Sequence, residues 1–95
     1  MSKAKKRSRL QLVMDILEAL DQHGELHATE LSLEVRLSYD RLKAILKELN
    51  ERGLIEVKQV ENEHKSLMIG LTPEGYRLLD ELRRLRKILE EYGLA

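Results

Sequence analysis

Apolar residues in the first quarter of the chain follow the spacing of an amphipathic helix. One face of this helix is marked by four residues at positions i, i+3, i+4 and i+7, namely Val13, Ile16, Leu17 and Leu20. Leu10 and Leu12 widen this apolar stripe. Ser8 is a suitable N-cap and Gly24 a suitable stop, so the pattern predicts a helix from about Arg9 to Gln22.

Two shorter stretches with helical spacing follow closely. The first covers residues 28–35, and the run Arg36-Leu37-Ser38 interrupts it. Ser38 is a good N-cap for a further helix, predicted most strongly over residues 41–49 and ended by Gly53 as its C′ residue. The buried face of that helix is expected to consist of Leu42, Ile45, Leu46 and Leu49.

Downstream of this helix the apolar period changes to about two residues, which is typical of strands. Residues 54–60 and 66–71 are predicted strands, and the polar residues 61–65 connect them, so the pair forms an antiparallel hairpin. One or two residues of the segment 24–27 could pair with the hairpin as a short first strand.

A last helix is predicted to start at Thr72-Pro73-Glu74, with threonine as N-cap and proline at the first helical position, and to run to about Tyr92. Its apolar residues repeat with spacings of four and three, and the stripe consists of Leu78, Leu82, Leu85, Leu89 and Tyr92, broadened by Ile88. The second half of this helix extends past so small a body and exposes the stripe, which favours a homodimer. The alternative is a helix folded back wholly on its own core.

The predicted order is α-β-α-α-β-β-α, a mainly helical α+β fold with a small β hairpin. The short turn between the second and third helices is the geometry of a helix-turn-helix, and the hairpin after it is then a wing. We divide the chain into a basic flexible N-terminal arm (residues 1–9), a winged helix-turn-helix domain (residues 10–72) and a C-terminal helix (residues 73–95) that covers the core and dimerises.

Two motifs carry a resemblance to a known family. The run Leu49-Asn50-Glu51-Arg52-Gly53-Leu54-Ile55 resembles the junction of recognition helix and wing in winged-helix regulators of the MarR-like and PadR-like kind. The run Leu71-Thr72-Pro73-Glu74-Gly75 resembles the point where that wing ends and the final helix begins. The overall plan, over about residues 10–92, is also similar to small archaeal winged-helix dimers with a C-terminal coiled-coil helix.

This resemblance implies that the third helix enters the DNA major groove with its N-terminal half. Contacts to phosphates or base edges are then expected from Arg36, Ser38, Tyr39, Arg41, Lys43 and Lys47, with a modest contribution from Lys58 and Lys65 in the wing. Asp40 and Glu51 lie on the same outer helix face and weaken the case for tight binding. The alternative is that this charged face is simply solvated.

Charge changes the picture mainly at the N-terminus. The 95 residues carry 17 Lys and Arg and 17 Asp and Glu, so the net charge is zero. Five basic residues lie within the first nine, with no acid among them, and Lys5, Lys6 and Arg7 are therefore expected to bind DNA phosphates. A disordered solubilising terminus is the equal alternative.

The remaining composition excludes several classes of protein. The chain has no Cys, and its three His are too scattered for a metal site. Because no Gly-rich phosphate loop or hydrolase motif is present either, we expect no enzyme, cofactor or metal. No apolar run approaches the ~20 residues of a membrane span, so a cytoplasmic, nucleoid-associated protein is predicted.

These patterns together predict a dimeric protein that binds double-stranded DNA and regulates transcription. An architectural chromatin protein is one alternative, and a winged helix that binds other proteins without direct DNA contact is another. No polar constellation in the sequence predicts a small-molecule effector.

Overall fold

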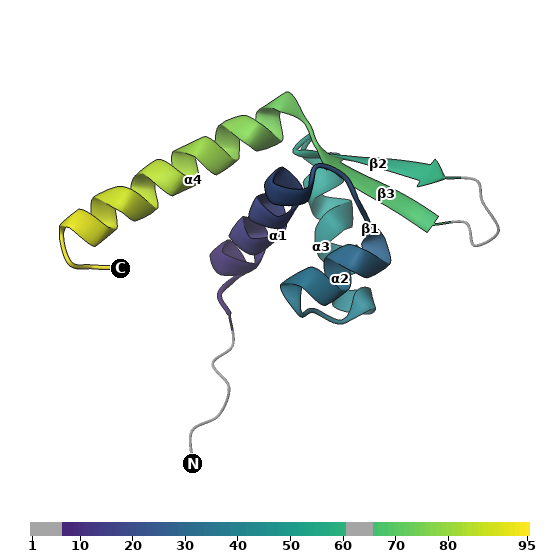
Figure 1. Cartoon of the computed structure of the whole chain (residues 1–95), viewed down its shortest axis with the longest axis horizontal. Helices are drawn as coiled ribbons and strands as arrows, with labels where there is room; N and C mark the ends of the chain where they lie inside the picture. Colours follow the sequence, from purple (N-terminus) through teal and green to yellow (C-terminus); the bar gives the residue numbers. More distant parts are fainter. Residues whose placement is uncertain (1–6, 61–65) are drawn as a thin grey trace, which may run out of the picture.

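The computed structural model describes residues 7–60 and 66–95 (Figure 1). Within these residues the chain forms helices α1 (Arg9–His23), α2 (Ala28–Val35), α3 (Tyr39–Glu51) and α4 (Pro73–Glu91), and strands β1 (Leu26–His27), β2 (Ile55–Val60) and β3 (Ser66–Leu71). The order α-β-α-α-β-β-α confirms the predicted mainly helical winged-helix fold.

Side-chain caps set where three of the helices begin. The hydroxyl of Ser8 accepts a hydrogen bond from the backbone N–H of Gln11 at 3.1 Å, and that of Thr72 accepts one from Gly75 at 3.1 Å. Ser38 caps α3 in the same way, so this helix starts at Tyr39, earlier than its strongest predicted part. These bonds satisfy backbone donors that have no partner within the first turn.

The three strands form an antiparallel sheet in which β3 is central (Figure 1). β2 and β3 form the predicted hairpin, with Ile55 opposite Leu71. The short predicted first strand is confirmed as β1, whose Leu26 lies opposite Ile69 of β3. The sheet therefore connects the loop after α1 to the wing, which places α1, α2 and α3 around one core.

The core is built almost entirely from aliphatic side chains on the predicted faces. Its most completely buried members are Ile16, Leu17, Leu20, Leu31, Leu42, Ile55, Ile69 and Leu79. All four apolar positions predicted for α3 are buried. The prediction that Leu10 widens the buried stripe of α1 is wrong: its side chain is 57% exposed, because it lines an open groove between α1 and α4, whereas Leu12 is buried.

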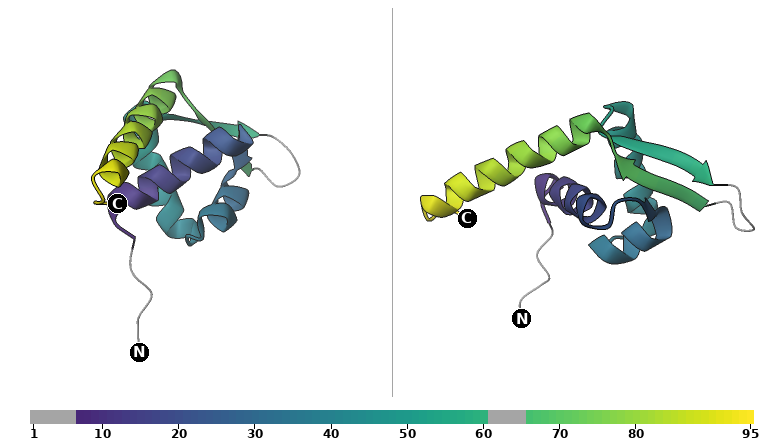
Figure 2. Two further views of the ribbon diagram at one scale, coloured as in Figure 1. Left: turned by 60° about the vertical axis from the view of Figure 1, so that its left-hand side comes forward. Right: turned by 45° about the horizontal axis from the view of Figure 1, so that its top comes forward.

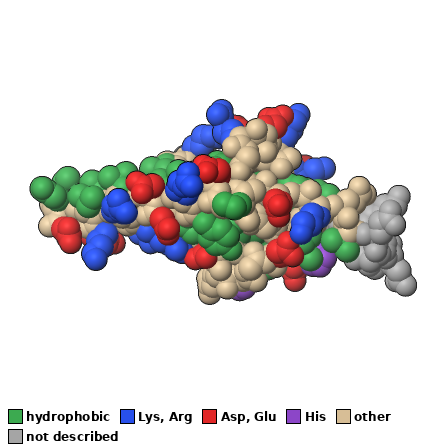
Figure 3. All heavy atoms as spheres, turned by 90° about the horizontal axis from the view of Figure 1, so that it is seen from above, with side chains coloured by type: hydrophobic (Ala, Val, Ile, Leu, Met, Phe, Trp, Pro, Cys, Tyr) green, Lys and Arg blue, Asp and Glu red, His purple; other side chains and the backbone are tan. Residues whose placement is uncertain are grey.

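Helix α4 buries its apolar residues on the body mainly in its first half. Leu79 is buried against the core, whereas the C-terminal half extends beyond α1 (Figures 1 and 2). Leu85 is 48% exposed, Ile88 43% and Tyr92 76%, and hydrophobic side chains line one edge of this helix in Figure 3. The predicted exposure of the stripe is therefore confirmed for these three residues, whereas Leu89 is half-buried because it lines a groove with Leu10 and Met14 of α1.

Ion pairs between α1 and α4 accompany the apolar contact. Arg83 lies 3.1 Å from the carboxylate of Asp21, and Arg86 lies 3.1 Å from that of Glu18. Arg83 also approaches Glu18, at 3.5 Å. Because each of these side chains is partly exposed, the pairs orient α4 more than they stabilise the fold.

Candidate nucleic-acid interface

The turn between α2 and α3 is tight. Arg36 adopts a left-handed backbone conformation with φ of 55°, and the N–H of Leu37 donates to the carbonyl of Ser32 at 3.0 Å. The hydroxyl of Ser32 donates in return to the carbonyl of Leu37, whose side chain is buried. This bonding aims Arg36 outward and starts α3 immediately after the turn, as a helix-turn-helix requires.

The outward side of α3 carries four of the predicted DNA-binding residues. Tyr39, Arg41, Lys43 and Lys47 are all exposed. The ammonium group of Lys43 lies 5.6 Å from the ring centroid of Tyr39, a cation–π distance that orders both side chains. Among the described residues, Arg41, Lys43 and Lys47 have no carboxylate within ion-pair distance. Their charges are therefore available to an anionic partner.

A groove separates α3 from the wing on one flank of the helix. Its floor is apolar, and α3 lines it with Leu46, Lys43, Lys47 and Asn50, opposite Val57, Leu67 and Ile69 of the sheet. Successive strand residues point to opposite faces, so Lys58 projects from the other face, where it pairs with Glu25 at 3.4 Å. The structure thus does not bring Lys58 together with α3, and the predicted contact by Lys65 lies outside the described residues.

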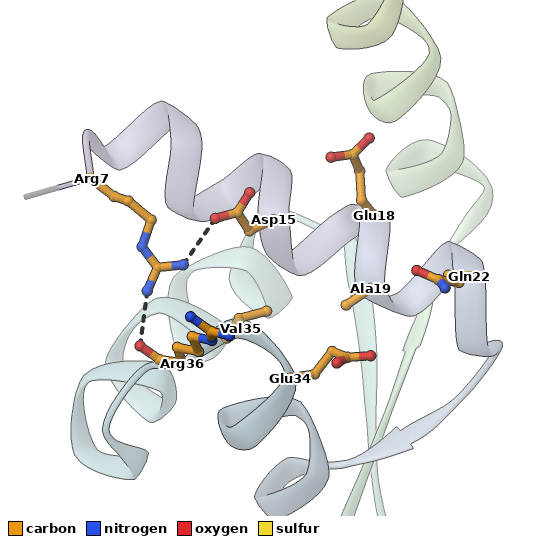
Figure 4. Close-up of a pocket in the computed structure, with 8 residues that line it drawn as sticks. All are labelled: Arg7, Asp15, Glu18, Ala19, Gln22, Glu34, Val35 and Arg36. Atoms are coloured by element: carbon orange, nitrogen blue, oxygen red, sulfur yellow. Dashed lines mark hydrogen bonds and ion pairs between the residues drawn. The ribbon is translucent and has the colours of Figure 1, made fainter.

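The other flank of α3 faces the start of α1, where residues assigned to the arm belong to the folded domain. Arg9 is the first residue of α1. The guanidinium of Arg7 lies 2.9 Å from the carboxylate of Asp15 and donates to the carbonyl of Arg36 at 2.9 Å (Figure 4). Arg7 therefore connects α1 to the helix-turn-helix. The expected contacts by Lys5 and Lys6 lie outside the described residues.

Arg7 also borders an open cavity of about 400 Å³ between α1 and α2 (Figure 4). Its other polar lining comes from Asp15, Glu18, Gln22, Glu34 and Arg36. A surface with three carboxylates does not suit a nucleic-acid phosphate. The cavity is therefore a boundary of the basic surface around α3 and not part of it.

One carboxylate on α3 lies close to the basic residues. Glu48 forms an ion pair with Arg9 and a second one with Arg52 at 3.5 Å. Hydrogen bonding and charge attraction by Arg9 lower the pKa of Glu48 below its usual range, with a smaller effect from Arg52. The pair of Glu48 with Arg9 was not predicted from the sequence. The one available signal is that Glu48 lies seven residues after Arg41 and therefore on the same flank of α3.

The lowered pKa of Glu48 makes a prediction about acid stability. A carboxyl with a depressed folded-state pKa contributes stability that is present above its unfolded value, about 4.3, and is lost as the pH falls through the folded value. The difference in urea midpoint between the wild type and Glu48→Gln should thus be largest near neutral pH and vanish once the pH lies below the folded-state pKa of Glu48. The control Glu51→Gln removes a neighbouring carboxylate. If the difference in urea midpoint between Glu51→Gln and the wild type falls with pH to the same extent, Arg9 is not the cause of the pH dependence.

No group of three or more His, Cys, Asp or Glu in residues 7–60 and 66–95 could bind a metal ion. None of the helices that the structure describes is both long and apolar enough to cross a membrane.

The geometry just described defines a winged helix-turn-helix, and comparison with known sequences agrees. The winged helix-turn-helix family model matches residues 6–90, so the chain belongs to this family. The assignment agrees with the prediction that the chain is not an enzyme. A comparison with curated protein sequences gives no match.

Solved regulators share the fold, as the resemblance to MarR-like proteins implied. The PcaV transcriptional regulator from Streptomyces coelicolor is similar with a TM-score of 0.81 and 20% identity, over 87% of this chain and 61% of that chain. YusO from Bacillus subtilis gives 0.80 and 20%, over 87% and 59%. A cysteine-to-serine mutant of MarR from E. coli, complexed with operator DNA, gives 0.71 and 18%, over 77% and 52%. The chain thus spans less than two thirds of the length of these three proteins.

Proposed function

We propose that this protein is a homodimeric transcriptional regulator that binds double-stranded DNA with α3 in the major groove. The observation that carries the proposal is the outer side of α3, where Arg41, Lys43 and Lys47 are exposed and have no ion pair with the residues described. The similar fold of MarR, solved with operator DNA, supports it. Net charge does not, because the chain as a whole is neutral.

The proposed roles follow from position on α3 and its turn. Lys43 and Lys47 lie four residues apart on one side, which suits two phosphates along a DNA strand. Tyr39 and Arg41 lie in the first turn, where side chains of a recognition helix reach phosphates or base edges. Arg36 and Ser38 in the turn before it contribute phosphate contacts, and Ala44 permits close approach of the helix to the groove.

The dimer is proposed from α4. Leu78 and Leu82 are partly buried on the body, and the stripe continues through Leu85, Ile88, Leu89 and Tyr92 beyond it. An apolar row of this kind on a charged helix is covered when a second copy packs against it. Two copies related by a two-fold axis present two α3 helices to one duplex.

The double substitution Lys43→Gln and Lys47→Gln should weaken binding to duplex DNA about ten-fold at moderate salt and reduce the slope of log affinity against log salt by about 2. The reason is the loss of two phosphate contacts with their released counterions. Fluorescence anisotropy across a salt series measures both quantities. Arg84→Gln with Lys87→Gln, on the outward side of α4, is the matched control and should leave the slope unchanged.

The proposed function is tested by selecting bound sequences from a random pool of duplex DNA. A palindromic consensus is expected, because a two-fold dimer reads two identical half-sites. Recovery of bound DNA without a consensus would instead support the architectural role. Absence of binding even at low salt would overturn the proposal and favour a winged helix that binds protein.

A further inference from the structure

A second groove borders α3 on the flank opposite the wing. It lies between the start of α1 and the N-terminal half of α3, and it is lined by Arg7, Arg9, Leu12, Arg41, Ala44 and Ile45. Three of these six residues are arginines: Arg9 from α1, Arg41 from α3, and Arg7 from the segment that precedes α1. Because Arg41 and Ala44 also belong to the outer side of α3, the groove is continuous with the surface proposed to meet DNA.

The three arginines differ in how firmly they are engaged. Arg7 is bound on both sides, to the carboxylate of Asp15 and to a backbone carbonyl, and it is partly buried. Arg41 has no carboxylate within ion-pair distance in the described part of the chain. Arg9 pairs with Glu48 only at the surface, where its side chain is 58% exposed. The fixed Arg7 thus forms one wall, and the other two guanidinium groups can turn toward a ligand.

The position of Glu48 indicates what kind of ligand fits. A guanidinium group presents the same fork of donors to a carboxylate and to a phosphate. The carboxylate of Glu48 therefore occupies the position on Arg9 where an external phosphate would bind. Since exposed ion pairs are weak, an external anion that also contacts Arg41 can replace Glu48 at little cost.

We infer that this groove binds a phosphate of the DNA backbone through Arg9 and Arg41, and that Glu48 occupies Arg9 in the free protein. The inference rests on the proposed function and extends it to a contact outside the helix-turn-helix. A duplex that lies along α3 passes this flank, so a backbone phosphate beside the major groove reaches it. Glu48 accordingly lowers DNA affinity, because the ion pair between Arg9 and Glu48 must break before Arg9 can bind the phosphate.

The test measures binding of a mixed-sequence DNA duplex by anisotropy over a salt series. Arg9→Gln should weaken binding about five-fold at low salt and reduce the salt slope by about 1, and Arg9→Lys should restore the slope. Glu48→Gln should strengthen binding about three-fold. The controls Arg84→Gln and Glu91→Gln change charge equally on the outward side of α4, and both should leave the slope unchanged. Circular dichroism melts check that each variant is folded.

A second readout separates a contact from a general charge effect. In the wild type, the side-chain Nε resonance of Arg9 should shift on titration with DNA, and that of Arg84 should not. If the wild type binds no DNA, this inference and the proposed function both fall. If the wild type binds but Arg9→Gln behaves like Arg84→Gln, or Glu48→Gln like Glu91→Gln, the groove is not a phosphate site and the proposed function stands.

Discussion

Replacing Leu85 and Leu89 with glutamate should convert the proposed dimer into a monomer. Both residues belong to the α4 stripe beyond the core cluster: Leu85 is 48% exposed and Leu89 is half-buried, so the domain itself should remain folded. Four carboxylates would then face one another in the interface, where their burial is costly. Sedimentation velocity measures the mass directly, and the wild type should sediment as a dimer.

The same variant should lose DNA affinity although it keeps every proposed DNA contact. Joining two recognition helices raises affinity by about 100-fold or more over one, so the monomer should bind a two-site duplex at least that much more weakly. Leu33→Glu is a matched control, because Leu33 is an isolated leucine on α2 that is 80% exposed. It should stay dimeric. A dimer that persists in Leu85→Glu/Leu89→Glu would contradict the proposed role of α4.

Gly75→Ala should destabilise the fold by about 3 kcal/mol. An added Cβ at this position would lie 2.1 Å from the carbonyl oxygen of Leu54 and 3.0 Å from the side chain of Leu71. That carbonyl accepts the N–H of Thr72 at 3.2 Å, so it cannot move without losing a hydrogen bond. Helix propensity alone predicts the opposite sign, since alanine stabilises a helix interior by up to about 1 kcal/mol over glycine.

Urea unfolding of the wild type and Gly75→Ala measures this difference. Gly70→Ala is the matched control in the same part of the chain. Its Cβ would meet only the side chain of Glu25, at 3.3 Å, and that side chain can turn into solvent. Gly70→Ala should therefore cost less than about 1 kcal/mol. Equal losses in the two variants would show that the contact with Leu54 is not what requires glycine at position 75.

The elements of the fold could be predicted because local signals agree with the packing. Capping residues mark the starts of α1, α3 and α4, and Gly53, with φ of 74°, ends α3 where the sequence places it. The four apolar residues of α3 are buried as expected. Even the two-residue strand β1 was predictable, because a segment too short for a helix lies beside a hairpin with an open edge.

The site was less predictable, because its two flanks depend on tertiary contacts. Helix periodicity identifies the outer side of α3, but it does not show that Lys58 projects from the other sheet face toward Glu25. Nor does it show that Arg9 meets Glu48, since these residues lie far apart in the sequence. The exposure of Leu10 has the same origin: spacing assigns a helix face, and only packing decides whether another element covers it.

Helix α1 contacts both functional surfaces of the domain. Its first turn reaches α3 through Arg9, and its last two turns reach α4 through Glu18 and Asp21. In a two-fold dimer, a small tilt of α4 on α1 is doubled by symmetry and changes the distance between the two α3 helices. Since DNA half-sites are separated by a fixed helical repeat of about 34 Å, the α1–α4 ion pairs help to determine which half-site separation the dimer can span.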